Sequence, residues 1–140
     1  MGDVMLNELF SNLATLASLE YQERYVIGGT EQEHVAIDDL IDDFLASVDW
    51  MNTQIMSESD RNALNDFAQF LDKNRDGALA AKSFAEVKPL MRNSQIWMDI
   101  RLRASEAMSL LDLDWHHIPV EELDEHIWDY GVQQRIALRD

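Results

Sequence analysis

The sequence contains no cysteine, so a small scaffold held together by disulfide bonds is excluded. It has only 2 proline and 5 glycine residues, too few for a protein built from many short strands and tight turns. Hydrophobic residues make up 46% of its 140 residues. A chain of this length buries roughly two-thirds of its unfolded surface. We therefore expect a single all-α domain over 1–140, with a helical amino-terminal half, 1–56, and a second half, 57–140.

Long apolar runs are also missing. No stretch of about 18 apolar residues occurs, and the first residues, MGDVMLNELF, do not place a basic segment before an apolar one. We expect neither a signal peptide nor a membrane span, and we predict a cytoplasmic protein that does not bind membranes.

Basic side chains are scarce: 11 stand against 27 acidic ones, and the net charge is −16. Two stretches hold seven carboxylates each and no Lys or Arg: Glu31, Glu33, Asp38, Asp39, Asp42, Asp43 and Asp49; and Asp112, Asp114, Glu121, Glu122, Asp124, Glu125 and Asp129. The segment 73–103 is different, with seven bases and three acids. Such a field repels nucleic acid and attracts a cation or a basic protein.

Apolar residues recur at spacings of three and four, which predicts about six helices. The first runs from about Asp3 to the region of Glu23, and the second carries the stripe from Ile37 to Val48. The others are predicted to begin at Ser57 or Ser59, near Phe84, at Asn93 or Ser94, and at Pro119. Thr30 and Glu33 have the spacing of a capping box.

The segment DKNRDGALAAKS, from Asp72 to Ser83, carries the clearest chemical pattern. Its oxygen-bearing groups at the first, third, fifth and seventh positions are Asp72, Asn74, Asp76 and the carbonyl of Ala78. A glycine at the sixth position, Gly77, and flanking helices complete the pattern of a calcium-binding loop. In register and in both flanks this segment resembles the EF-hand family, whose calmodulin-like members pair two such loops. The resemblance implies a helix–loop–helix in which Leu79 contacts the neighbouring loop.

The end of the segment departs from the family pattern. Ser83 stands where a bidentate Glu is required, and Lys73, Arg75 and Lys82 leave the segment with a formal charge of +1. The resemblance then implies a degenerate site with a calcium dissociation constant of about 10⁻⁴ M or weaker. An ordinary polar turn between helices is the alternative, because Asp, Asn and Gly are common turn residues.

A second loop would complete the pair. In DLDWHHIPVEEL, Asp112 and Asp114 match the first ligand positions, Ile118 the apolar pairing position and Glu122 the terminal acid. The following LDEHIWDYG is similar to the last helix of sarcoplasmic-type calcium-binding proteins. His116 and His117 occupy the place of the glycine turn, and we interpret them as surface or capping residues in preference to metal ligands.

No nucleophile motif, phosphate loop or catalytic triad occurs, which favours binding over catalysis. We predict an EF-hand-like protein that needs no cofactor, with calcium weak, structural or absent, and that binds a basic or amphipathic helical segment of another protein. Its groove would be rimmed by acids that include Asp38, Asp39, Asp42 and Asp43 and lined by Met91, Met98 and Met108. Two alternatives stay open: an acidic inhibitor, such as an immunity protein that neutralises a basic toxin, and a calcium buffer or sensor in which Glu86 or a water replaces the missing ligand.

Overall fold

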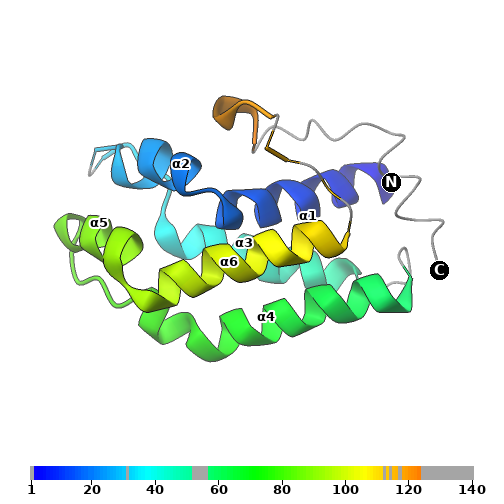
Figure 1. Ribbon diagram of the computed structural model, residues 1–140. Coiled ribbons are helices and arrows are strands. Elements are labelled where there is room, and N and C mark those ends of the chain that lie inside the picture. Colours follow the sequence, from blue (N-terminus) through cyan, green and yellow to red (C-terminus); the bar gives the residue numbers. More distant parts are fainter. Residues whose placement is uncertain are drawn as a thin grey trace.

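The computed structural model describes residues 2–30, 32–51, 57–111, 113, 115–116 and 118–123, with the side chains of 2–7, 50 and 51 left out (Figure 1). This part of the chain contains α-helices and no strand, which confirms the all-α prediction. There are six described α-helices: α1 (Gly2–Ala17), α2 (Leu19–Tyr21), α3 (Ile37–Met51), α4 (Glu58–Ala78), α5 (Phe84–Asn93) and α6 (Gln95–Leu110). A π-helix, η1 (Gln22–Ile27), follows α2, and a 3₁₀ turn, η2 (Val120–Glu122), lies near the end of the description.

Four of these helices form a bundle. The packed pairs are α1 with α3, α3 with α4, α4 with α6, and α6 with α1, so that α3 and α6 occupy opposite corners. Figure 1 shows that neighbours around this ring run in opposite directions, as in an up-and-down bundle, although α2 and η1 lie between α1 and α3 and α5 lies between α4 and α6. The bundle thus takes α1 and α3 from the first half of the chain and α4 and α6 from the second.

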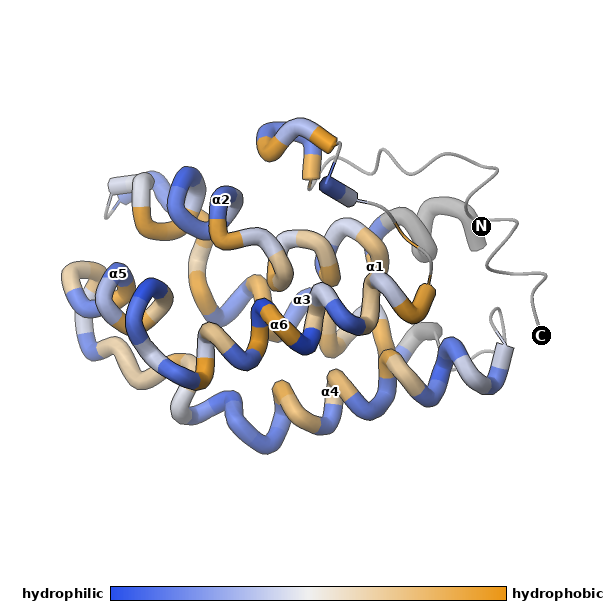
Figure 2. Tube along the Cα trace, viewed as in Figure 1, coloured by the Kyte–Doolittle hydropathy of each residue, from blue (hydrophilic) through white to orange (hydrophobic). Residues whose placement is uncertain are grey.

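The core lies on the inner stripes of these helices. Figure 2 shows apolar and polar residues alternating along α4 and α6 about one turn apart, as expected when one side of each helix faces the core. Phe44 of α3 packs against Phe67 of α4 with ring centroids 5.3 Å apart. Trp97 of α6 is fully buried, and its Nε1 donates a hydrogen bond to the carbonyl oxygen of Ala78 at 2.9 Å. None of the described helices is long and apolar enough to cross a bilayer.

Serine caps begin two of the bundle helices, as predicted. The Ser57 hydroxyl accepts a hydrogen bond from the Asp60 amide, and the Ser94 hydroxyl accepts one from the Trp97 amide. The predicted capping box at Thr30 and Glu33 does not begin a helix. The Thr30 hydroxyl accepts from the Glu33 amide at 2.9 Å, but this contact closes a turn in the loop, and α3 begins only at Ile37.

The first predicted helix is broken. It stops at Ala17, and Ser18 adopts an extended conformation and caps the short α2. Gln22, at the start of η1 and fully buried, donates from Nε2 to the carbonyls of Thr15 and Leu16, which the break leaves open. Its Oε1 accepts from Nη1 of Arg101 on α6 at 2.9 Å. Through these hydrogen bonds, Gln22 links the carboxyl end of α1 to α6.

The last predicted helix is described only at its start. Val120–Glu122 forms a 3₁₀ turn that packs against α2, and Val120 and Leu123 are buried there. The remainder of that predicted helix, over 124–136, lies outside the described residues.

Candidate functional site: an acidic pocket between two helices

The predicted calcium loop does not begin at Asp72, because α4 continues without a break to Ala78. Residues two apart on a helix point to opposite sides, so Asp72, Asn74 and Asp76 cannot converge on one ion in this arrangement. The connection to α5 is confined to 79–83. The prediction of a loop over 72–78 is therefore wrong.

Packing explains why the helix continues. The buried stripe of Leu64, Phe67 and Leu71 reaches one heptad further to Ala78, which is fully buried. The Ala78 carbonyl, one of the predicted ligands, accepts from the indole of Trp97. Another predicted ligand, Asn74, donates from its side chain to the Phe70 carbonyl at 2.8 Å.

Ser83, the last predicted ligand of this segment, is exposed at the N-cap of α5. Its side chain makes no capping hydrogen bond, and the Lys82 amide is bonded instead by Oε1 of Glu86 at 3.0 Å. Glu86 thus supplies a hydrogen bond at the start of α5. The calcium-sensor alternative instead predicted that Glu86 or a water would replace the missing calcium ligand.

The second predicted loop is described only in part. Asp112, Asp114 and His117 lie outside the described residues. Ile118 lines a small cavity with Ser18 and Leu19 of the α2 region, whereas Leu79 ends α4 on the other side of the bundle (Figure 1). The predicted contact between Leu79 and Ile118 is therefore wrong.

The remaining predicted ligand, Glu122, lies in η2 and is partly buried. Among the residues with described side chains, no three His, Cys, Asp or Glu groups are arranged to hold a metal. Weak or absent calcium binding stays a prediction.

The methionines do not form the predicted groove. Met91 and Met108 are fully buried and belong to the core, because they lie on the inner sides of α5 and α6. Met98, on the outer side of α6, is 45% exposed. The prediction of an exposed methionine groove is wrong for the first two residues.

The four predicted acids of α3 are all exposed, but two adjacent ones have different environments. Asp42 faces α4, where Arg75 donates two hydrogen bonds, from Nε at 2.9 Å and from Nη2 at 2.8 Å, to its carboxylate oxygens. The hydrogen bond from Arg75 lowers the pKa of Asp42. Arg75 thus already neutralises the negative charge of Asp42 on the side of α3 that faces α4.

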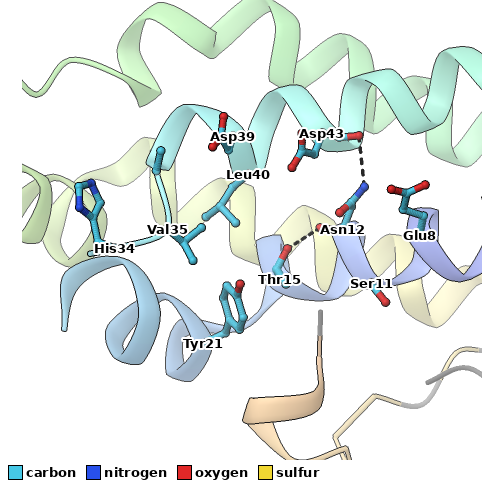
Figure 3. A pocket seen from close by; sticks show the side chains of 11 residues that line it. Glu8, Ser11, Asn12, Thr15, Tyr21, His34, Val35, Asp39, Leu40 and Asp43 are labelled. Carbon is cyan, nitrogen blue, oxygen red and sulfur yellow. Dashed lines mark hydrogen bonds between the residues drawn. The ribbon is translucent and has the colours of Figure 1, made fainter. Parts of the chain in front are cut away.

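The other side of α3 faces α1 across a pocket of about 390 Å³ (Figure 3). Carboxylates stand on both walls, Glu8 on α1 and Asp39 and Asp43 on α3. The lining also includes the aromatic ring of Tyr21 and the aliphatic side chain of Leu40. The pocket therefore combines acidic walls with an aromatic ring and an aliphatic side chain.

Asn12 joins the two walls. Its side-chain nitrogen donates to the Asp43 carbonyl at 3.2 Å and to the Ser47 hydroxyl at 2.8 Å, and Figure 3 shows the first of these bonds crossing from α1 to α3. Ser47 also donates to the Asp43 carbonyl. These bonds fix the spacing of α1 and α3 beside the carboxylates, so the pocket is formed before any ligand arrives.

The pocket concentrates negative charge. Partial burial raises the pKa of Asp43, and the nearby carboxylates of Asp39, Glu8 and Asp42 raise it further. The ion pairs found between described side chains join Arg24 with Glu121, Arg75 with Asp42, and Arg92 with Glu23, and none of them reaches a carboxylate of the pocket. A cation placed here would stabilise the ionised carboxylates.

Two of the pocket's acids, Asp39 and Asp43, are among the predicted partner-binding residues, whereas the other polar residues of its walls, including Glu8 and Asn12, are not. Glu8 and Asn12 lie on the polar side of the first predicted helix, four residues apart, and this spacing was the available signal. The sequence does not show which side of α3 they would face. Comparison of the chain with protein-family models, with curated proteins and with solved structures found no match.

Proposed function

We propose that this protein binds a basic segment of a partner protein and that an Arg or Lys side chain of the partner enters the pocket between α1 and α3. The contrast between adjacent aspartates carries the proposal. Asp42 has a cation of its own chain, and its pKa is lowered, whereas Asp43 has other carboxylates beside it, and its pKa is raised. Since no ion pair between described side chains reaches the carboxylates of the pocket, we infer that its complementary charge comes from another molecule.

The shape of the pocket favours a long basic side chain over a small ion. Glu8 stands on one wall and Asp39 and Asp43 on the other, so a ligand must reach between two helices. A guanidinium carries five donors in a planar fork and suits several carboxylates at once. The methylene stem of Arg or Lys can lie along the half-buried side chain of Val35, which also lines the pocket.

The surrounding charge supports fast association. A protein of net charge −16 attracts a basic partner over long distances, and such steering raises the association rate at low salt. Exposed ion pairs alone give little affinity, so the recessed pocket would supply the specific contact. An inhibitor of a basic toxin is one form of this function. The EF-hand-like form, which depends on calcium loops, gains no support from a helical 72–78 segment.

The first test measures binding of a helical peptide that carries arginines four residues apart. Asp39→Asn and Asp43→Asn should each weaken its affinity about tenfold, or about 1.4 kcal/mol, because each removes a carboxylate from the pocket. Asp38→Asn is the matched control: it makes the same chemical change on the same helix at a residue that does not line the pocket, and we expect less than about a twofold effect. Titration calorimetry at fixed salt would measure all four proteins.

Two results would contradict the proposal. Equal weakening by Asp38→Asn and Asp43→Asn would show that only the total charge of α3 matters. Equal affinity for a peptide with citrulline in place of arginine would show that the site does not recognise a cation. Circular dichroism of each variant would establish that the helices are retained.

The second test uses pH. Since the pKa of Asp43 is raised, this group takes up a proton at a higher pH than the value of about 3.9 of an ordinary aspartate. Arginine keeps its charge throughout this range, so affinity for the peptide should fall as the pH drops through the pKa of Asp43. Asp43→Asn should flatten this part of the profile, and Asp38→Asn should keep it. An unchanged profile in Asp43→Asn would exclude Asp43 as the titrating group.

A further inference from the structure

The acidic pocket between α1 and α3 presents hydrogen-bond acceptors to a ligand. The polar residues of its lining that are at least partly exposed are Glu8, Asn12, His34, Asp39 and Asp43. Three of them carry carboxylates, which only accept hydrogen bonds when they are ionised. The other two, Asn12 and His34, can donate as well as accept, so their existing bonds decide what they offer.

The donors of Asn12 are already used. Its side-chain nitrogen has two N–H groups, and it donates to the Asp43 carbonyl and to the Ser47 hydroxyl. This orientation of the amide follows from its partners, because a carbonyl can only accept and the Ser47 hydroxyl donates its own hydrogen to the Asp43 carbonyl. Asn12 therefore offers the pocket its Oδ1, which is an acceptor.

His34 is restricted in the same way. Its Nδ1 lies 2.8 Å from the Thr30 carbonyl oxygen, and a carbonyl can only accept, so the hydrogen is on Nδ1. In the neutral ring, Nε2 is then an acceptor. The ring also packs against Phe84 with centroids 4.6 Å apart, which helps to hold it in this orientation.

Ser11 adds a buried hydroxyl to the same lining. It is 2% exposed and lies on α1 next to Asn12 (Figure 3). Its Oγ has no hydrogen-bond partner in the described part of the chain. A buried polar group without a partner is unfavourable, and a donor supplied by a ligand would remove this penalty. This unpaired hydroxyl is evidence for a ligand that is independent of the carboxylates.

From this set of acceptors we infer that the pocket selects a guanidinium group and thereby distinguishes arginine from lysine. The inference rests on the proposed function, in which a basic side chain of the partner enters the pocket. A guanidinium holds five N–H donors in one plane and has no acceptor, whereas an ammonium group has three donors on a single atom. The wider group can reach the carboxylates of both walls and the Ser11 hydroxyl together.

The experiment is titration calorimetry of the whole chain with three forms of the helical peptide. The basic positions carry arginine, lysine or asymmetric dimethylarginine. We expect the arginine peptide to bind at least about tenfold more tightly than the lysine peptide. Dimethylarginine keeps the positive charge but loses donors, so its peptide should also bind at least about tenfold more weakly than the arginine peptide.

Ser11→Ala tests the buried hydroxyl. It should lower the affinity for the arginine peptide about fivefold and leave the affinity for the lysine peptide almost unchanged. The free energy of unfolding, measured in urea, should not fall, because the hydroxyl has no partner in the free protein. Ser109→Ala is the matched control, since it makes the same change at an exposed position of α6 that does not line the pocket. It should bind both peptides like the wild type.

The possible failures can be told apart. Equal affinity for the arginine and lysine peptides would overturn this inference and leave the proposed function standing. Equal affinity for the arginine and dimethylarginine peptides would show that the pocket recognises charge and not donors. Unchanged arginine binding in Ser11→Ala would overturn the role given to the hydroxyl. Absence of any binding by the arginine peptide would overturn both the inference and the proposed function.

Discussion

Trp97→Ala is expected to lower the free energy of unfolding by about 3–5 kcal/mol, the range found when a large buried aromatic side chain is truncated. Trp97 is fully buried on α6, and its Nε1 donates to the Ala78 carbonyl near the end of α4. The substitution leaves a cavity between these helices and an unsatisfied carbonyl. Urea denaturation at neutral pH would measure the loss.

Trp97→Phe separates the two contributions. It keeps an aromatic ring in the core but removes the donor, so the Ala78 carbonyl loses its partner. We expect a smaller loss than in Trp97→Ala and fraying of the last turn of α4, visible as faster amide exchange over 75–79. A loss below about 1 kcal/mol in Trp97→Ala would show that the contact of α4 with α6 is not organised as described.

The second large effect is expected at the break between α1 and α2. Gln22→Leu keeps a side chain of similar size but removes both polar ends of a fully buried group. The carbonyls of Thr15 and Leu16 then lose their donor, and Arg101 loses one of its two acceptors while keeping the Met91 carbonyl. We expect a loss of about 3 kcal/mol in the free energy of unfolding, because buried polar groups are left unpaired.

Gln69→Leu provides the control for this prediction. It makes the same chemical change at an exposed position of α4 and should alter stability by no more than about 0.5 kcal/mol. If Gln22→Leu were as mild as Gln69→Leu, the hydrogen bonds across the break would not contribute to stability. Urea denaturation of both variants under one set of conditions would decide.

The four bundle helices could be predicted from the sequence because each repeats apolar residues at spacings of three and four over several turns. The break at Ser18 could not. Leu16 and Leu19 continue the same spacing across it. The carbonyls at the break are satisfied by Gln22, and Gln22 is in turn bonded by Arg101, some 80 residues later in the chain. A local pattern contains no information about such a partner.

The extent of α4 shows the opposite case, in which two local signals compete. Asp72, Asn74, Asp76 and Gly77 favour a turn, but the apolar stripe of the helix continues to Ala78. The burial of Ala78 and its bond to Trp97 decide the competition in favour of the helix, and neither can be seen before the helices are packed. For the acidic pocket, the sequence identified the aspartates of α3. Only the structure shows that Asp42 faces Arg75 and that Asp43 faces Glu8 and Asn12.

The order of the helices around the bundle has a kinetic consequence. Three of the four helix–helix contacts, here called seams, join long helices that follow one another in the chain: α1 with α3, α3 with α4 and α4 with α6. Most contacts can therefore form between segments that are near in the sequence. Chains with such local contacts fold quickly, because little conformational entropy is lost in closing the loops before favourable contacts form. The seam between α1 and α6 is the exception, since it joins segments about 90 residues apart in the chain. We expect this seam to form late, so that substitutions within it mainly accelerate unfolding and leave the folding rate almost unchanged.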